Sequence, residues 1–487
     1  MTVSARGASP AVGGRLGAGA ALLTAGLGLA AVTATALVDP RYVFGIGVGA
    51  LAAVVVVFHP QMGLLAATAF TVLRFPDIAT DYHGAPSLFQ PLMGLLGIAI
   101  ALRWLTTAER PAGGGRAAAA VIAFGLVALG SLVMADSAAD GVPDLELFAR
   151  DAIVAVMVGM LLRSAATLRR VVWVLIGGGA LLATMSVLQV IGVPGEAFGG
   201  FAQSQFKNIL GDLDDIRIAG PVGDANFYAQ WLVMLVPFAL DRMWNERSRR
   251  LRLAAGYAAA VMGAAVVFTF SRGGAVALVV VAGAMLVRHP PRARTVLAVA
   301  LAAVAVVPLL PAEYTGRLAT LTQIGSVDAG TDISIRIRTS EFEAGLAMFS
   351  DSPLLGQGYG TYFENYPDYS RQVGIDLRSK GREAHNLYVE LAAETGILGL
   401  AMFAGLILFA YASIGEGRRR MRRLGSFAGD DIGYAIGVAL AGYLITSTFL
   451  HMALARLPWL VIGLAFALPS AATTMSRNRA AGQEVEA

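Results

Sequence analysis

The chain has 487 residues, of which 56% are hydrophobic and only 14% are charged. Soluble domains carry about 25% charged residues, so this composition excludes a soluble globular protein. The net charge is +4, and most basic residues are arginines in short segments between apolar runs, which fits membrane topology better than binding to DNA or RNA. Cysteine is absent, so there is no disulfide or thiolate from which to argue.

Apolar runs long enough to cross a bilayer, about 17 to 25 residues, recur along most of the chain. We therefore predict an all-α polytopic membrane protein. The predicted spans are residues 16–37, 43–58, 62–74, 88–105, 117–134, 146–163, 171–192, 224–240, 253–270, 274–287, 295–310, 386–412, 431–449 and 455–472. They number fourteen, or twelve if residues 43–74 form a re-entrant hairpin, and both counts return the chain to the same side. The first run is too long for a typical signal-peptide core and is interpreted as a retained span.

Arginine alternates between the loops of this topology. Every second loop is rich in it, through Arg110, Arg116, Arg169, Arg170, Arg242, Arg247, Arg249, Arg250, Arg252, Arg288, Arg292, Arg294, Arg418, Arg419, Arg420, Arg422 and Arg423. Basic loops stay in the cytoplasm, which predicts a multi-pass protein of the plasma (inner) membrane with both termini inside. The predicted organisation is a cytoplasmic tail at 1–15, membrane helices over 16–310 with an external loop at 193–223, a long external loop at 311–385, membrane helices over 386–472 and a cytoplasmic tail at 473–487.

Two arginines lie in short external segments, where the topological bias disfavours them. Arg217 belongs to the loop 193–223, and binding of a polyanion is its leading interpretation because a guanidinium fork holds phosphate oxygens through two hydrogen bonds. A surface salt bridge with an aspartate of the same loop is the alternative. Arg272 lies in FTFSRGGA at 268–275, where the serine and glycines allow a helix N-terminus to approach an anion closely. An interfacial anchor or turn explains Arg272 equally well.

The long external loop carries Phe342, Leu346 and Phe349 at helical spacing, followed by Pro353. This pattern predicts a helix followed by a turn. Arginines also precede this stripe, but long loops cross the membrane whatever their charge, so their position alone does not single them out.

Arg336 and Arg338 are those two arginines, and four further polar residues lie at or just after the end of the loop. His385 and Asn386 open a predicted span where a helix N-terminus meets water, although a lone histidine is more often structural than catalytic. Glu390 and a second glutamate four residues later share one helix face near the external boundary. Carboxylates at membrane depth are functional candidates, with a polar contact between helices as the alternative.

The remaining histidines are His59, His83, His289 and His451. They show no metal-ligand spacing with one another or with carboxylates, and two of them fall on the predicted cytoplasmic side. The sequence therefore predicts no metal site and no cofactor.

Four ordered segments carry a resemblance to a known family. HNLYVELAAETGILGL at 385–400 resembles the histidine–asparagine signature of the O-antigen ligase and polymerase superfamily. RIAGPVGDANFYA at 217–229, FTFSRGGA at 268–275 and RTSEFEAGLAMFSDSPLLGQGYGTYF at 338–363 agree with it in order. The family usually has tryptophan where Phe342 stands. The resemblance covers roughly residues 217–400 and adds nothing for the earlier spans.

The resemblance implies a GT-C-like membrane glycosyltransferase with a long loop over a lateral cavity. It would move a glycan from an undecaprenyl-pyrophosphate carrier to the hydroxyl of a glycan or lipid acceptor, by inversion and without metal, cofactor or nucleotide sugar. By the same resemblance, Arg217 and Arg338 bind the pyrophosphate and His385 is the general base. Arg272 joins the pyrophosphate ligands, and Arg336, Asn386 and Glu390 are possible supporting residues. The active site then faces the extracytoplasmic side.

Three alternatives stay open from the sequence. The shared motifs do not separate a ligase from a polymerase. A permease for polysaccharide or lipid-linked glycan also has many spans, although permeases place polar sites near the bilayer midplane on broken helices. An inactive scaffold of an export assembly is the third reading, which the retained arginines and histidine disfavour.

Overall fold

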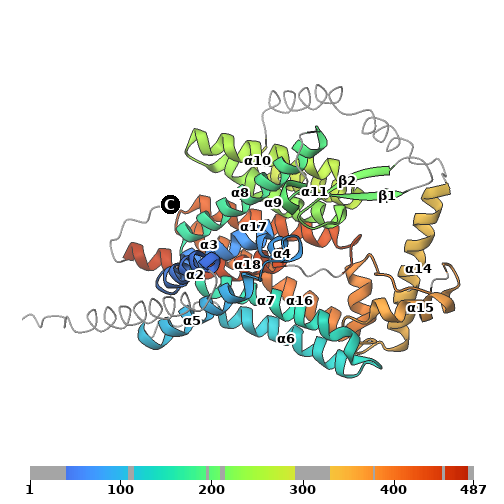
Figure 1. The fold of residues 1–487 in the computed structure, drawn as a ribbon. Helices are drawn as coiled ribbons and strands as arrows, with labels where there is room; N and C mark the ends of the chain where they lie inside the picture. The colour runs from blue at the N-terminus through green and yellow to red at the C-terminus, as the bar shows by residue number, and fades with distance from the viewer. Residues whose placement is uncertain are drawn as a thin grey trace, which may run out of the picture.

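The computed structural model describes residues 40–107, 114–192, 197–208, 214–290, 329–376, 379–451 and 456–480. The predicted spans 16–37 and 295–310 lie outside these residues, whereas each of the other predicted spans coincides with helix, so the all-α polytopic prediction is confirmed (Figure 1). The helices are α2 (Pro40–Phe58), α3 (Pro60–Leu73), α4 (Phe75–Asp81), α5 (Phe89–Thr107), α6 (Gly114–Val133), α7 (Ala138–Leu161), α8 (Ala165–Val190), α9 (Ala225–Asn245), α10 (Arg249–Phe268), α11 (Arg272–Arg288), α14 (Ala329–Asp351), α15 (Tyr362–Val373), α16 (Leu387–Arg423), α17 (Phe427–Thr446) and α18 (Arg456–Ala480).

Six of the described helices, α5, α6, α8, α10, α16 and α18, are long and apolar enough to cross a bilayer. The pair α3 and α4 makes a seventh if it is counted as one broken span, because the two helices meet at an angle of 56°. The chain bends at Arg74, whose φ of 51° is left-handed, so the break lies at the end of the segment predicted as a re-entrant hairpin. The total of twelve to fourteen spans remains a prediction.

The ends of the helices gather on two opposite faces. At one end, Arg288 closes α11 and binds Asp430 and Asp431 at the start of α17, with nitrogen–oxygen distances of 2.9 and 2.8 Å. Arg418, near the end of α16, also binds Asp430, at 2.8 Å. We call this end the arginine face. The sequence predicted a loop over 414–430, but α16 continues to Arg423, so most of these arginines lie on its last turns.

At the other end, the chain forms the only described β-structure, within the predicted external loop 193–223. A short 3-10 helix, η1 (Ala197–Gly200), precedes the antiparallel strands β1 (Gln203–Asn208) and β2 (Asp214–Gly220). Figure 1 shows that this hairpin lies at the same end of the bundle as α14 and α15. We call this end the hairpin face. The all-α prediction missed the hairpin because its strands are short and lie beside much longer helical patterns.

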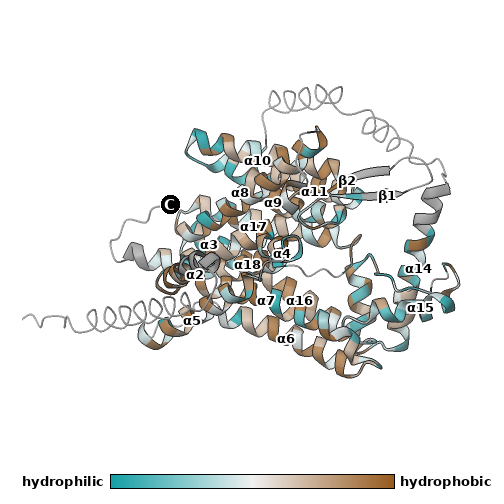
Figure 2. Cartoon of the chain, in the orientation of Figure 1, coloured by the Kyte–Doolittle hydropathy of each residue, from teal (hydrophilic) through white to brown (hydrophobic). Residues whose placement is uncertain are grey.

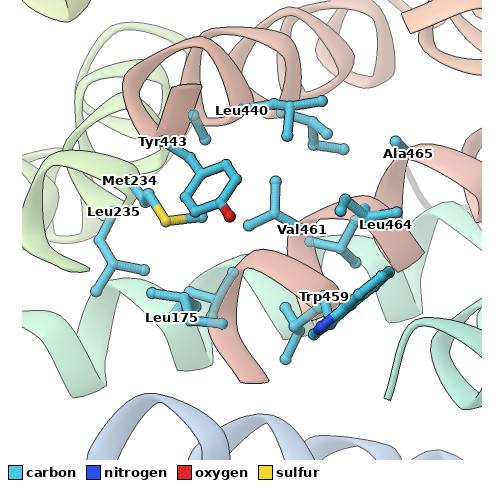
Figure 3. Close-up of a cluster of buried hydrophobic side chains, with 14 of the residues drawn as sticks. Leu175, Met234, Leu235, Leu440, Tyr443, Trp459, Val461, Leu464 and Ala465 are labelled. Carbon is cyan, nitrogen blue, oxygen red and sulfur yellow. The ribbon is translucent and has the colours of Figure 1, made fainter. Parts of the chain in front are cut away.

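The interior of the bundle is built around α9, α17 and α18. Figure 3 shows Met234, Tyr443, Trp459 and Val461 of these helices packed together with Leu175 of α8. In the apolar stretch of α18, 78% of the residues are buried within the protein, against 28% in that of α5. Helix α18 is therefore surrounded by other helices, and α5 presents an apolar surface suited to lipid (Figure 2).

The predicted helix of the long loop is confirmed as α14, which ends at Asp351 just before Pro353. The face that it buries is not the one that carries these aromatic and aliphatic residues. Phe342 and Leu346 are 41% and 39% exposed, whereas the opposite side, with Ala344 and Met348, is buried against tyrosines of α15. Helix α15 was not predicted because its sequence, YFENYPDYSRQV, is too polar to show an apolar stripe.

Candidate active site

Arg217 lies on β2 at the hairpin face, and its side chain points into the bundle. It is 8% exposed, and its Nε donates to the carbonyl of Thr269 at 2.7 Å. Its Nη2 donates to Oδ1 of Asn226 at 3.0 Å. Both acceptors are neutral, and among the described side chains no carboxylate forms an ion pair with Arg217. The salt-bridge alternative concerned Asp212, Asp214 and Asp215, whose side chains lie outside the described residues.

The segment RIAGPVGDANFYA folds as a strand, a turn and a helix start. Gly220 ends β2 with a φ of 55°, and a Cβ atom there would lie 2.4 Å from the ring of Tyr228, so only glycine fits. Asp224 caps α9 by accepting from the backbone N–H groups of Asn226 and Phe227 at 2.8 and 3.0 Å. The side chain of Gln205, the β1 residue paired with Arg217, donates to Asp224 at 3.1 Å. These contacts fix the strand, and therefore Arg217, against α9.

The junction of α10 and α11 supplies the carbonyl that Arg217 binds. Ser271 caps α11 by accepting from the backbone N–H of Gly274 at 3.2 Å, and Arg272 is exposed in the first turn. A Cβ atom at Gly273 would lie 2.7 Å from the ring of Phe449, and one at Gly274 would lie 2.6 Å from Ala229. The two glycines thus leave room for Phe449 and for Ala229 of α9. Binding of an anion at the start of α11 stays a prediction. Arg272 itself remains a predicted ligand.

Arg338 lies on α14 and faces the Arg217 side chain. Burial lowers the pKa of Arg217, Asp224 opposes this, and the positive charge of Arg338 lowers that pKa further. Arg338 forms no ion pair with the described residues and is exposed. The structure therefore brings two arginines that are distant in sequence close enough to interact electrostatically, and neither forms an ion pair among the described residues. Arg336, by contrast, lies 3.9 Å from a carboxylate oxygen of Asp376.

His385 precedes α16 in a strained backbone conformation, with a φ of 48°. Its Nδ1 lies 3.1 Å from the carbonyl oxygen of Glu383. A carbonyl can only accept a hydrogen bond, so Nδ1 carries the proton in the neutral ring and Nε2 keeps its lone pair. The side chain is 36% exposed, which leaves the ring accessible. This arrangement suits a proton acceptor.

Behind His385 lies Glu341, a residue that the sequence did not single out. Its Oε2 is 3.8 Å from Nδ1 of His385, and its Oε1 accepts from Nη1 of Arg382 at 3.0 Å. The side chain is 1% exposed, and Oε2 has no hydrogen-bond partner among the described residues. A buried carboxylate beside a histidine orients the ring and stabilises its charged form. Its signal in the sequence was its place three residues after Arg338, one helical turn away.

The supporting residues on α16 have structural contacts. Asn386 caps α16 by accepting from the backbone N–H groups of Tyr388 and Val389 at 3.0 and 3.2 Å. Glu390 is buried in the next turn, 5% exposed. Glu394 is also buried and accepts from the backbone N–H of Tyr362 at 3.0 Å. Asn386 therefore sets the position of His385 by starting the helix directly after it.

Helix α16 is broken at Gly396, where φ is 62° and ψ is −163°. The connection between α14 and α15 supplies the hydrogen bonds lost there. Gln357 N donates to the carbonyl of Ala393 at 2.8 Å, and Ile397 N donates to the carbonyl of Pro353 at 2.9 Å. The helices of the hairpin face are thus attached to α16 through its backbone.

One group of described residues has ligand atoms close enough together for a metal, Asp241, His289 and Asp431, whose atoms lie within 4.8 Å of one another. The sequence showed no such spacing, because the three come from α9, the end of α11 and α17. The group lies at the arginine face, away from His385. Asp241 is bound to Arg242 at 2.7 Å and Asp431 to Arg288 at 2.8 Å, so arginine already compensates both carboxylates.

The fold is that of an α-helical polytopic membrane protein, with Arg217, Arg338 and His385 at one face. Residues 257–404 match the model of the O-antigen ligase family. The resemblance to the O-antigen ligase and polymerase superfamily is thereby confirmed over that region, which contains Arg272, Arg338 and His385. Arg217 lies before it. The match supports a ligase-like or polymerase-like role in glycan assembly. No curated protein matches the chain.

Proposed function

We propose that the protein transfers a glycan from an undecaprenyl-pyrophosphate carrier to an acceptor hydroxyl during the synthesis of cell-surface polysaccharide, with inversion at the anomeric carbon. The observation that carries the proposal is the joint presence of Arg217 and Arg338, which form no ion pair among the described residues, and of His385, whose Nε2 keeps its lone pair. The arginines suit an anionic leaving group, and the histidine suits an acceptor hydroxyl. The family match at 257–404 supports the same class of reaction.

In the proposed reaction, the acceptor hydroxyl gives its proton to Nε2 of His385 while its oxygen forms a bond to the anomeric carbon. The bond from that carbon to the pyrophosphate oxygen breaks, and its electron pair leaves with the undecaprenyl pyrophosphate. Arg217 and Arg338, with Arg272 at the nearby start of α11, stabilise this negative charge. Glu341 holds the ring of His385 and stabilises the imidazolium that forms.

Arginine side chains provide the positive charge that a divalent cation provides in many phosphate reactions, so the proposed transfer needs no metal. We propose that the hairpin face is extracytoplasmic, because the opposite face collects the arginines of the predicted cytoplasmic loops. A permease remains the second candidate in principle, but the residues of the candidate site gather at one face and not at the midplane. Ligase and polymerase reactions would use the same site.

The test is the His385→Ala variant in nanodiscs, supplied with the lipid-linked oligosaccharide and the acceptor fraction from cells that lack the protein. The assay contains a strong chelator and scores donor binding and product formation separately. We expect transfer to slow by about 10²–10⁴-fold, the usual contribution of a positioned base, with donor binding little changed. His83→Ala, at an exposed histidine on the same predicted side, is the matched control.

Two results would contradict the proposal in different ways. Normal turnover of weakly bound donor would make His385 a binding residue and Glu390 the next candidate base. Activity that disappears on chelation and returns with one divalent ion would disprove the metal-free reaction.

A further inference from the structure

His451 lies between the two parts of the candidate site. It follows α17, and its ring centroid is 5.6 Å from that of His385. On its other side, its ring meets the ring of Phe227 edge to face, with 4.8 Å between centroids. Phe227 follows Asn226, the residue that accepts a hydrogen bond from Arg217. His451 therefore joins the part of the site that holds the arginines to the part that holds the proton acceptor.

A ring nitrogen of His451 is buried without a partner. Within the described part of the chain, Nδ1 makes no hydrogen bond. An unsatisfied buried polar atom costs about 1–3 kcal/mol, so its presence beside a reactive histidine points to a ligand group that meets it. Burial and then the neighbouring His385 lower the pKa of His451 to about 4, against an opposing effect of Asp224. The ring is therefore neutral near pH 7 and is available as a hydrogen-bonding group.

We propose that Nδ1 of His451 hydrogen-bonds a hydroxyl group of the acceptor sugar, which makes His451 a substrate-binding residue of this site. The inference rests on the glycan transfer proposed above. A neutral imidazole has one N–H and one lone pair, and a hydroxyl can both donate and accept, so it pairs with Nδ1 in either tautomer. A phosphate oxygen could pair only with the tautomer that carries a proton on Nδ1, and in the proposed reaction the arginines already bind the phosphates. Since His451 adjoins His385, the sugar that it meets is the one that carries the attacking hydroxyl.

Three variants separate the ring contact from the hydrogen bond. His451→Asn keeps an amide near the position of Nδ1, His451→Gln moves the amide outward, and His451→Phe keeps the ring contact with Phe227 but has no nitrogen. KM for acceptor, KM for donor and kcat are measured with the lipid-linked oligosaccharide and acceptor fraction from cells that lack the protein. We expect the Phe and Gln variants to raise the acceptor KM by roughly tenfold, as for loss of one hydrogen bond, and the Asn variant to stay within about threefold of wild type. Donor KM stays unchanged, and His83→Asn is the control.

Each outcome either supports or contradicts the role proposed for His451. An unchanged acceptor KM in a folded Phe variant would overturn the inference, and so would a rise in donor KM alone. If the Phe variant does not fold, the difference between the Asn and Gln variants gives the same decision. Wild-type protein that transfers no glycan from this donor would remove the proposed function and the inference together. Transfer by the wild type with equal activity in all three variants would remove the inference only.

Discussion

The two faces of the bundle differ in how some of their arginines are paired with carboxylates. At the arginine face, Arg288, Arg418 and Arg422 converge on Asp430, which is 1% exposed, at 2.8 to 2.9 Å. At the hairpin face, Arg217 donates only to neutral oxygens, and Arg338 has no ion pair among the described residues. The charges of these three arginines are neutralised at the first face, and their ion pairs connect helices. At the second face, Arg336 and Arg382 lie beside carboxylates, whereas Arg217 and Arg338 remain available to a ligand.

Within the described part of the chain, one carboxylate of the hairpin face also lacks an ion pair. Glu383, at the hairpin face, forms no ion pair among the described residues, and burial, then Asp144 and Glu341, raise its pKa to about 7. Uncompensated charge away from water costs stability, so evolution retains it mainly where a site uses it. The difference between the faces therefore locates the candidate site more sharply than the number of arginines does.

The largest expected effect separates the arginines of the two faces. Arg338→Ala and Arg217→Ala should reduce glycan transfer by about 10³-fold or more, because each removes a fixed charge from the departing pyrophosphate. Lysine at either position should restore only part of the rate, since a point charge cannot replace the fork. Arg418→Ala at the arginine face should leave transfer near wild type and lower stability by about 1–3 kcal/mol. Transfer rates and thermal unfolding in detergent measure both quantities, and full activity in Arg338→Ala would remove that residue from the site.

A smaller effect is expected from Glu341, which acts through His385. Glu341→Gln should slow transfer by about 10–100-fold, as for other residues that orient a reactive ligand, with donor binding unchanged. Glu343→Gln, at an exposed glutamate on the same helix, is the control. An unchanged transfer rate in Glu341→Gln would remove this role from Glu341.

The smallest effect concerns stability and Glu383. Its pKa in the folded protein, about 7, is above the ordinary value of 4.5, so the folded state holds the proton more tightly. The resulting stabilisation is complete below pH 4.5 and is lost as the pH rises through 7, with a total of at most about 3 kcal/mol. Glu383→Gln should therefore flatten the dependence of unfolding temperature on pH between 5 and 8. Glu364→Gln, at an exposed residue, should leave the slope as in wild type.

The sequence predicted the parts of the fold that repeat over long stretches. Hydropathy located the described membrane helices, and the stripe before Pro353 located α14. The stripe did not indicate the buried face of α14, because Phe342 and Leu346 are exposed while the contacts are made by the small Ala344 and by Met348. Short strands and the polar α15 have no comparable periodic signal.

The site was predictable one residue at a time but not as an arrangement. Arg217 and Arg338 stood out by topology or resemblance, whereas their proximity depends on how β2 packs on α9 and on where α14 lies in the fold. Glu341 and His451 have no motif of their own. Their proposed roles are inferred from contacts with His385, which join residues 44 or more positions apart in the sequence.

The break at Gly396 constrains how this protein is made. A Cβ atom there would lie 2.4 Å from the backbone of Leu354, and the open carbonyl and N–H groups of α16 are satisfied by the chain between α14 and α15. Lipid offers no hydrogen bonds, so α16 cannot settle as a separate helix with these groups unpaired. Residues 353–358 leave the ribosome before α16 does, and they have to be in place on the far side of the bilayer when it inserts. Insertion of α16 and folding of the preceding loop are therefore one event, in which the membrane span is completed by a segment outside it.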